Sequence, residues 1–184
     1  MGGADADLPG IDHVVVVGLM GAGKSTIGRG LAERLGWPWL DSDTEIERAT
    51  GQTVRELRDD EGVVAMHARE ADQLRAALAT SGPLVESAAA SIADSDACLE
   101  ALRQPGVAVV WLRVTPAALA ARFAGETHRP SYGDDPETFL ADQMATRGPR
   151  FASVDPVIVD EDGRTPDQVT DVALRGLRER ATRD

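Results

Sequence analysis

Residues 18–25 combine glycine, lysine and serine at the spacing of a phosphate-binding loop. Gly18, Gly23, Lys24 and Ser25 fit the pattern G-x-x-x-x-G-K-S, which directly follows four consecutive valines. Glycines in such a loop let successive backbone N–H groups approach an anion, and the helix that follows adds the positive end of its dipole. The lysine would reach the β- and γ-phosphates, and the serine hydroxyl would coordinate Mg²⁺. The pattern therefore predicts a binding site for a nucleoside triphosphate and Mg²⁺.

The position of this loop between a strand and a helix favours a phosphate-binding loop over a chance glycine-rich turn. A buried strand at 14–17 leads into the loop, and apolar residues at helical spacing follow it, as a phosphate-binding loop requires. The residues expected to contact the triphosphate are Gly21, Ala22, Gly23, Lys24, Ser25 and Thr26. Lys24 is also expected to act on the phosphates during phosphoryl transfer.

Two acidic residues lie at the end of the next predicted strand, at 37–41. Asp41 and Asp43 are two residues apart, and residues i and i+2 of an extended chain project to the same side. Both carboxylates are therefore expected at the carboxyl edge of the sheet, where such folds bind ligands. Beside an Mg²⁺–phosphate group, one carboxylate would hold the metal and the other would accept a proton from a substrate hydroxyl. The alternative is an acidic helix start in which Asp43 is the N-cap.

The amino-acid composition restricts which binding partners and which cellular compartment are expected for this chain. The chain has 184 residues, enough for one domain with a substantial core. Its 31 acidic and 19 basic residues give a net charge of −12, which argues against nucleic acid and anionic membranes as partners. Cys98 is the one cysteine and cannot form an internal disulfide, and no apolar run is long enough to span a membrane. We therefore expect a cytoplasmic protein, and the acidic surface fits a soluble monomer.

Strands alternate with helices along the whole chain. The predicted strands are 14–17, 37–41, 83–87, 107–114 and 157–159. A long helix is expected at 61–79, with Val64, His67 and Leu74 on one face. Such alternation implies right-handed crossovers, and the expected fold is a three-layer α/β/α P-loop domain with a five-stranded parallel sheet.

The chain is expected to form a flexible N-terminal segment at 1–10 and a single domain at 11–184. The first ten residues are acidic, unlike a signal peptide. The stretch G-E-T-H-R-P-S-Y-G-D-D-P is rich in turn formers and too polar for the core. A loop of this length in a compact domain predicts a lid at about 125–135.

Several segments together resemble the shikimate kinases of the nucleoside-monophosphate-kinase-like superfamily. They are G-L-M-G-A-G-K-S-T-I-G-R and L-D-S-D-T-E-I-E-R-A-T-G in the first third of the chain, then H-R-P, R-G-P-R-F and D-G-R-T-P. The likeness covers nearly the whole chain. It implies a kinase that uses ATP and Mg²⁺ to phosphorylate a hydroxyl of a small acceptor, either shikimate or a similar polyhydroxylated acid.

The resemblance also implies roles for residues near the transferring phosphoryl group. Asp41 would support the Mg²⁺ shell, and Asp43 would bind and deprotonate the acceptor hydroxyl. Arg129 would be the lid arginine that reaches the phosphoryl group. This role agrees with the chemistry, because phosphoryl transfer needs cations on the equatorial oxygens.

Three more arginines receive roles from the resemblance alone. Arg122 and Arg164 would flank the adenine, and Arg147 would bind the substrate carboxylate. Each has a plain alternative as a solvated surface charge.

Two departures from the family pattern fall on the acceptor side. Where the family has F-R-x-x-E, with an arginine that binds the shikimate carboxylate, this chain has M-H-A-R-E, so His67 stands at the arginine position. A neutral histidine offers one donor, and the loss of a charge-assisted pair costs about 1.5–3 kcal/mol. The family's triple glycine after the third strand is Ala88-Ala89-Ala90 here. The added methyl groups would reduce the space on which the substrate rests, while the Ala89 N–H would still be able to contact an anion.

Three hypotheses therefore stay open. The first is a shikimate kinase, and the second is a kinase for another sugar acid, sugar or cyclitol, similar to gluconate kinases. The third is a nucleotide-binding regulator without catalysis. His67 and the alanine triplet motivate the second hypothesis. Asp43 and Arg129 speak against the third, since a protein that only binds nucleotide needs neither.

Overall fold

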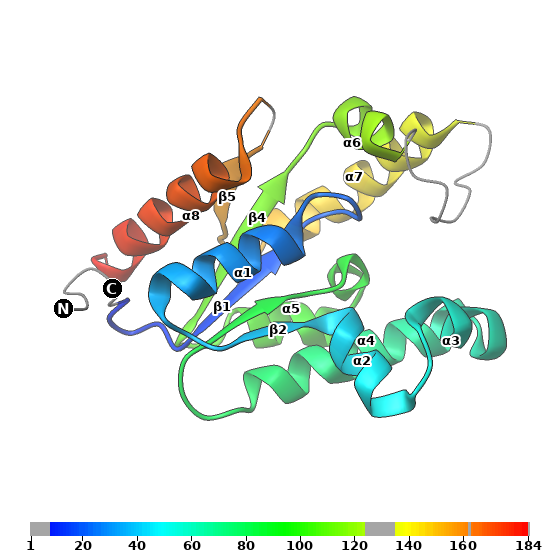
Figure 1. Cartoon of the computed structure of the whole chain (residues 1–184), viewed down its shortest axis with the longest axis horizontal. Helices are drawn as coiled ribbons and strands as arrows, with labels where there is room; N and C mark the ends of the chain where they lie inside the picture. The colour runs from blue at the N-terminus through cyan, green and yellow to red at the C-terminus, as the bar shows by residue number, and fades with distance from the viewer. Residues whose placement is uncertain (1–7, 124–134, 162, 184) are drawn as a thin grey trace.

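The computed structural model describes residues 8–123, 135–161 and 163–183 (Figure 1). The five strands in these residues form one parallel sheet in the order β2-β3-β1-β4-β5. They are β1 (His13–Val17), β2 (Trp39–Asp41), β3 (Leu84–Ser87), β4 (Val107–Arg113) and β5 (Val157–Asp160). This topology confirms the predicted α/β fold with a five-stranded parallel sheet.

The strand β1 lies at the centre of the sheet because its sequence is apolar on both faces. Val14, Val15, Val16 and Val17 are fully buried, and β1 pairs with β3 on one side and β4 on the other. Branched side chains pack well on a pleated surface, and a parallel strand covered on both faces needs such a continuous apolar run. The phosphate loop thus leaves the sheet from its most buried strand.

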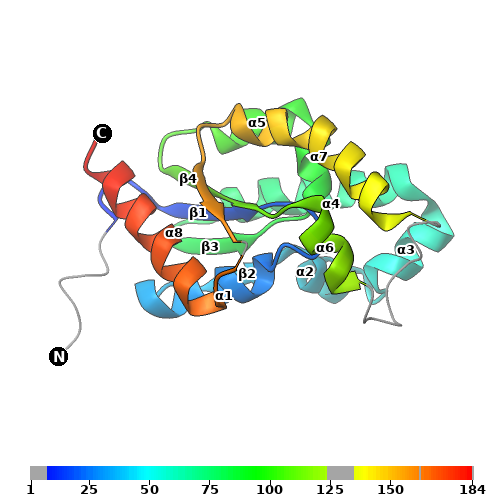
Figure 2. The same ribbon diagram turned by 90° about the horizontal axis from the view of Figure 1, so that it is seen from above.

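Helices cover both faces of the sheet and complete the three layers (Figure 2). α1 (Lys24–Leu35) and α8 (Pro166–Ala181) pack together on one face. α4 (Val63–Leu78), α5 (Asp96–Leu102) and α7 (Pro136–Ala152) lie over the other face. The remaining helical segments are α2 (Ser42–Thr50), α3 (Val54–Glu61), the 3₁₀ turn η1 (Ala90–Asp94) and α6 (Pro116–Phe123).

Gly62 separates α3 from α4, so the long helix predicted at 61–79 is present but begins only at Val63 and ends at Leu78. α3 ends at Glu61 and α4 begins at Val63, because Gly62 takes a φ of 88°, outside the helical range. The predicted apolar face is wrong at Val64, which is 86% exposed. The first turn of α4 lies beside α3, beyond the strands, so the sheet does not cover it (Figure 1).

The packed structure includes Leu8, which the sequence analysis placed in the flexible segment at 1–10. Leu8 is buried, and its carbonyl accepts a hydrogen bond of 3.0 Å from the Ile11 N–H. Residues 1–7 of that segment lie outside the described residues, as does the predicted lid at 125–135 except for Asp135, which caps α7. In the part of the chain that the structure describes, none of the helices combines the length and apolar character needed to cross a membrane.

Candidate active site

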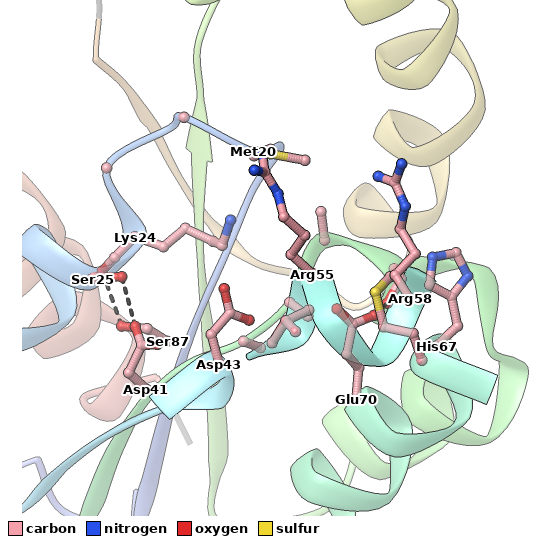
Figure 3. A pocket seen from close by; sticks show the side chains of 18 of the residues that line it. Met20, Lys24, Ser25, Asp41, Asp43, Arg55, Arg58, His67, Glu70 and Ser87 are labelled. Carbon is pink, nitrogen blue, oxygen red and sulfur yellow. Dashed lines mark hydrogen bonds between the residues drawn. The ribbon is translucent and has the colours of Figure 1, made fainter. Parts of the chain in front are cut away.

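The carboxyl ends of β1, β2 and β3, together with α3 and α4, surround a cleft of about 570 Å³ (Figure 3). At this edge of a parallel sheet the loops leave the strands, and ligands bind there in open α/β folds. The predicted site residues that line the cleft are Gly21, Gly23, Lys24, Ser25, Thr26, Asp41, Asp43, His67, Ala89 and Arg147. One cavity therefore brings together the predicted nucleotide side and the predicted acceptor side.

The phosphate loop takes a conformation that favours glycine at two positions. Gly21 and Gly23 have φ values of 81° and 79°, in the left-handed region. A Cβ atom at Gly23 would also lie only 2.9 Å from Glu161 Oε1. α1 begins at Lys24, so the first free N–H groups of the helix and the positive end of its dipole face the loop. This arrangement can hold a phosphate group.

The Lys24 side chain reaches into the cleft from the start of α1 (Figure 3). Its Nζ donates a hydrogen bond of 3.2 Å to the Leu19 carbonyl, which also accepts one of 3.2 Å from the N–H of the buried Ala22. Burial lowers the pKa of the Lys24 ammonium group, and the charges of Asp43 and Asp41 oppose this shift. The loop thus fixes the lysine beside both acids.

Ser25 and Asp41 connect the phosphate-loop helix to the end of β2. The Ser25 hydroxyl donates a hydrogen bond of 2.6 Å to Asp41 Oδ2, and Asp41 Oδ1 accepts one of 3.4 Å from the Thr44 N–H. Mg²⁺ prefers oxygen ligands and is usually held by one or two protein groups together with substrate phosphates. Two adjacent oxygen ligands beside a phosphate loop fit this requirement, so Ser25 and Asp41 could hold the metal.

Asp41 and Asp43 do not share one extended strand, contrary to the prediction. β2 ends at Asp41 and α2 begins at Ser42, so Asp43 lies in the first turn of a helix. The alternative prediction, Asp43 as N-cap, is also wrong, because Asp41 is the N-cap. The helix can begin this early because the Asp41 carboxylate accepts one of the otherwise unpaired N–H groups of the first turn. Both carboxylates nevertheless line the cleft.

Asp43 projects from α2 toward Lys24 in the cleft (Figure 3). Desolvation raises the pKa of its carboxyl group, the charge of Asp41 raises it further, and Lys24 opposes the shift. A carboxylate with a raised pKa accepts a proton more readily than a free aspartate. Asp43 therefore has the electrostatic setting of a general base.

The opposite wall of the cleft contains His67 and Glu70 from α4 and Arg147 from α7. Arg147 Nε and Nη2 donate hydrogen bonds of 3.1 and 2.5 Å to the Asp94 carboxylate. Desolvation lowers the pKa of His67, and Arg147 lowers it further, while Asp94 opposes the shift. The buried Glu70 accepts a hydrogen bond from the Ser91 hydroxyl, and desolvation raises its pKa. Near neutral pH this wall therefore has an uncharged histidine and an arginine already paired with a carboxylate.

The segment after β3 forms the floor of the cleft. Ala88 and Ala89 are buried, and the Ala88 N–H donates a hydrogen bond of 3.1 Å to the Val16 carbonyl. Ala88, Ala89 and Ala90 all have negative φ angles. Alanine fits this backbone without strain, so the cost of replacing glycine is limited to the space that the methyl groups occupy.

A family model for shikimate kinase matches residues 20–178, which is most of the chain. The chain belongs to the shikimate kinase family. A shikimate kinase of Streptomyces coelicolor is 35% identical over 161 residues, covering 88% of this chain and 92% of that protein. The family consists of phosphotransferases that act on an alcohol acceptor. The predicted resemblance is thereby confirmed.

Solved structures give the same assignment. A shikimate kinase from Acinetobacter baumannii in complex with shikimate has a TM-score of 0.81 and 30% identity over 95% of each chain. A gluconokinase from Sinorhizobium meliloti 1021 has a lower TM-score of 0.63 and 26% identity, covering 96% of this chain and 95% of that one. The fold and the family are thus those of shikimate kinases, and the likeness to a gluconokinase is weaker.

Two of the arginines to which the family resemblance gave roles, Arg122 and Arg164, do not line the cleft. Arg122 Nη1 donates hydrogen bonds of 2.9 Å to the Gly21 carbonyl and 2.8 Å to Glu161 Oε2, so Arg122 contacts the phosphate loop from outside. Arg164 is exposed and donates a hydrogen bond to the Asp160 carbonyl. Arg129 lies outside the described residues.

Several cleft residues of this shikimate kinase family member were missed by sequence reasoning. Arg55 and Arg58 line the cleft from α3, and their positions on one helical face with Val54 were a signal that spacing could have revealed. Ser87 also lines it, accepting a hydrogen bond of 3.0 Å from Trp39 Nε1 and donating one of 3.0 Å to the Lys24 carbonyl. No local pattern indicates this last link, because it joins three elements far apart in sequence.

Proposed function

We propose that this chain transfers the γ-phosphoryl group of ATP to a hydroxyl group of shikimate, with Mg²⁺ as cofactor. The observation that carries the proposal is the convergence of Lys24, Ser25, Asp41 and Asp43 on one cleft. The similar shikimate kinase from Acinetobacter baumannii, described in complex with shikimate, supports the choice of acceptor.

The phosphate loop and Lys24 bind the triphosphate in this proposal. Backbone N–H groups at the start of α1 hold the phosphate oxygens, and the Lys24 ammonium group neutralises charge on the β- and γ-phosphates. Ser25 and Asp41 would hold Mg²⁺, which would supply charge stabilisation for the transferring phosphoryl group. The 2.6 Å hydrogen bond between Ser25 and Asp41 keeps these two oxygen donors next to each other.

Asp43 prepares the acceptor for phosphoryl transfer. Its carboxylate accepts a hydrogen bond from the acceptor hydroxyl and takes the proton as the new O–P bond forms. The bond from the γ-phosphorus to the bridging oxygen of the β-phosphate breaks, and ADP leaves with that oxygen. The proton on Asp43 then passes to solvent. Lys24 lies close enough to lower the pKa of Asp43, so it favours the ionised form that the step requires.

Further roles in the proposal belong to four arginines. Arg129 reaches the transferring phosphoryl group from the lid, and Arg147 contributes to binding the acceptor. Arg122 and Arg164 lie on the adenine side. The hydrogen bonds of Arg122 to Gly21 and Glu161 support an added role in holding the phosphate loop.

Two specific features of the cleft favour a second class of acceptor. His67 is uncharged near neutral pH and Ala89 is buried in the floor, so the site differs from a glycine floor with a free arginine. Another polyhydroxylated acid, sugar or cyclitol is therefore the second candidate. We also propose a cytoplasmic monomer without nucleic-acid or membrane partners, which the net charge of −12 supports.

The test is ADP formation from ATP and Mg²⁺ in the presence of shikimate, quinate, gluconate or several cyclitols. Shikimate is expected to give the highest kcat/KM of the panel. Turnover of another compound at a higher kcat/KM would replace shikimate by that acceptor. Binding of ATP without turnover of any of them would support a nucleotide-binding regulator.

A further inference from the structure

The cleft contains a cation that has no part in the phosphate site. Arg58 lines the cleft from α3, and its side chain runs beside His67 toward α7 (Figure 3). The ion pair that the structure gives it joins Arg58 Nε to Asp59 Oδ1 at 3.9 Å, and both side chains are exposed. A pair this long and this solvated does little to hold a guanidinium group or to neutralise it.

Arg147 and His67, the two other groups near the expected acceptor carboxylate, do not offer it an unpaired positive charge. Arg147 directs Nε and Nη2 to Asp94, so that carboxylate already occupies one edge of its guanidinium group. His67 is uncharged near neutral pH, because desolvation and Arg147 both lower its pKa. An acidic acceptor therefore needs another cation on this side of the cleft.

The helix that carries Arg58 is held firmly in place. Thr53 and Glu56 form a capping box at the start of α3, and Leu57 is 1% exposed. At the end of the helix, Glu61 accepts hydrogen bonds of 2.7 and 2.8 Å from Arg69 of α4. A side chain on such a fixed element can present its guanidinium group at a defined place.

We propose that Arg58 on α3 is the residue that recognises the carboxylate of the acceptor, in place of His67 on α4. Because this role requires a carboxylic acid acceptor in the cleft, it rests on the proposed function. A guanidinium group binds a carboxylate through two parallel N–H···O bonds, which an uncharged imidazole cannot provide. The acceptor then lies with its acid group toward α3 and its reactive hydroxyl at Asp43.

The experiment compares shikimate with its methyl ester, which lacks the negative charge. Steady-state kinetics are measured for the wild-type protein, R58A, R58K and H67A. R75A is the matched control, because Arg75 is an exposed arginine on α4 paired with Asp72. For R58A we expect kcat/KM for shikimate to fall about 10- to 150-fold, the range for loss of a charge-assisted pair. The KM for ATP and kcat/KM for the ester should stay within about twofold of wild type in R58A.

The other variants separate recognition from a structural effect. R58K should recover part of the selectivity for shikimate over the ester, since lysine restores the charge without the planar fork. H67A and R75A should keep the wild-type selectivity. If R58A also keeps the wild-type selectivity for shikimate over the ester, Arg58 does not recognise the carboxylate of the acceptor. The same follows if H67A loses this selectivity instead. In both cases the proposed function stands. If the wild-type protein phosphorylates neither compound, the proposed function is wrong and the role of Arg58 falls with it.

Discussion

The Ser25 hydroxyl donates a hydrogen bond of 2.6 Å to the Asp41 carboxylate, which ties the first turn of α1 to the last residue of β2. The same carboxylate caps α2, the helix that carries Asp43. One side chain therefore connects the phosphate loop, the proposed metal site and the helix of the proposed base. Substitutions at Asp41 should affect both folding and metal binding, and the two effects can be separated.

Replacing Asp41 by asparagine should weaken metal binding without loss of the helix cap. Asparagine is a good N-cap residue, but its neutral amide is a poorer Mg²⁺ ligand than a carboxylate. We expect D41N to raise the Mg²⁺ concentration for half-maximal activity about 10- to 100-fold. D41A should show this effect and also lose about 1 kcal/mol of unfolding free energy. Magnesium titrations and urea denaturation measure the two effects, and an unchanged magnesium requirement in D41N would remove Asp41 from the metal site.

The pH dependence of kcat/KM should have an acid limb set by Asp43. Its pKa is raised mainly by desolvation, and the carboxylate must be ionised to accept the hydroxyl proton. Activity should therefore be present above this pKa and fall as the pH drops through it, at a pH above the ordinary aspartate value of 3.8. D43N should retain a low activity without this limb. An unaltered acid limb in D43N would assign the ionisation to another group.

Lys24 should set an alkaline limb in the same profile. Burial lowers its pKa below the ordinary value of 10.5, and the charged form is the one that binds phosphate. Affinity for ATP should thus weaken as the pH rises through that lowered pKa. K24R, which stays charged, should move the weakening to higher pH in a calorimetric titration with ATP. Coincident pH curves for K24R and wild type would contradict this role.

Much of the nucleotide side could be predicted because its signals are local. The strand at 14–17, the glycines of the loop and the lysine and serine after it lie within a dozen consecutive residues, and the structure has them as expected. The relative placement of Asp41 and Asp43 was harder to predict, because the chain leaves the extended conformation directly after Asp41, which caps α2 by accepting a hydrogen bond from the Thr44 N–H. The prediction of an extended chain placed both carboxylates at the correct edge of the sheet, although Asp43 reaches it from the first turn of a helix.

The acceptor side depends on pairings between distant residues, which composition and spacing do not reveal. Arg147 and Asp94 are 53 positions apart, and their hydrogen bonds change the charge that Arg147 can offer a substrate. The direction of Arg58 likewise follows from the way α3 and α4 fold back at Gly62. Tertiary contacts therefore decide which of several arginines can bind an acid.

Glu86 should make the stability of the protein depend on pH. This residue on β3 is 1% exposed, and burial raises its pKa to about 8. Between the ordinary value of 4.5 and about 8, the unfolded state releases a proton that the folded state keeps, so stability should fall as the pH rises through this window. E86Q lacks this ionisation. We expect its unfolding free energy to gain a few kcal/mol relative to wild type between pH 5 and pH 8, roughly as the shifted pKa requires.

Urea denaturation of wild type, E86Q and E33Q over this pH range measures the effect of Glu86. Glu33 is an exposed acid on α1 and serves as the control. E33Q should follow the wild-type curve. If the E86Q curve also runs parallel to wild type, the Glu86 carboxyl does not keep its proton in the folded state.

A side chain at Gly28 should crowd the contact between α1 and β3 and lower the stability of the protein. A Cβ atom there would overlap Ser87 Oγ and lie 2.9 Å from Trp39 Nε1. G28A should cost about 1–3 kcal/mol of unfolding free energy through overpacking, and it should weaken ATP binding by moving the first turn of α1. Adding S87A should relieve part of the cost, so the double variant should be more stable than the sum of the single changes predicts. Strict additivity in urea denaturation would show that the crowding is elsewhere.

The proposed kinase reaction is tested most directly by phosphorus NMR of the products formed from ATP, Mg²⁺ and shikimate. For the wild-type protein we expect ADP together with a new phosphate monoester on a shikimate hydroxyl. D43N should bind ATP with near-normal affinity and form the monoester at least about 100-fold more slowly, as expected when a general base is removed. Wild-type protein that forms no phosphate ester, or D43N that forms it at the wild-type rate, would contradict the proposed reaction at this cleft.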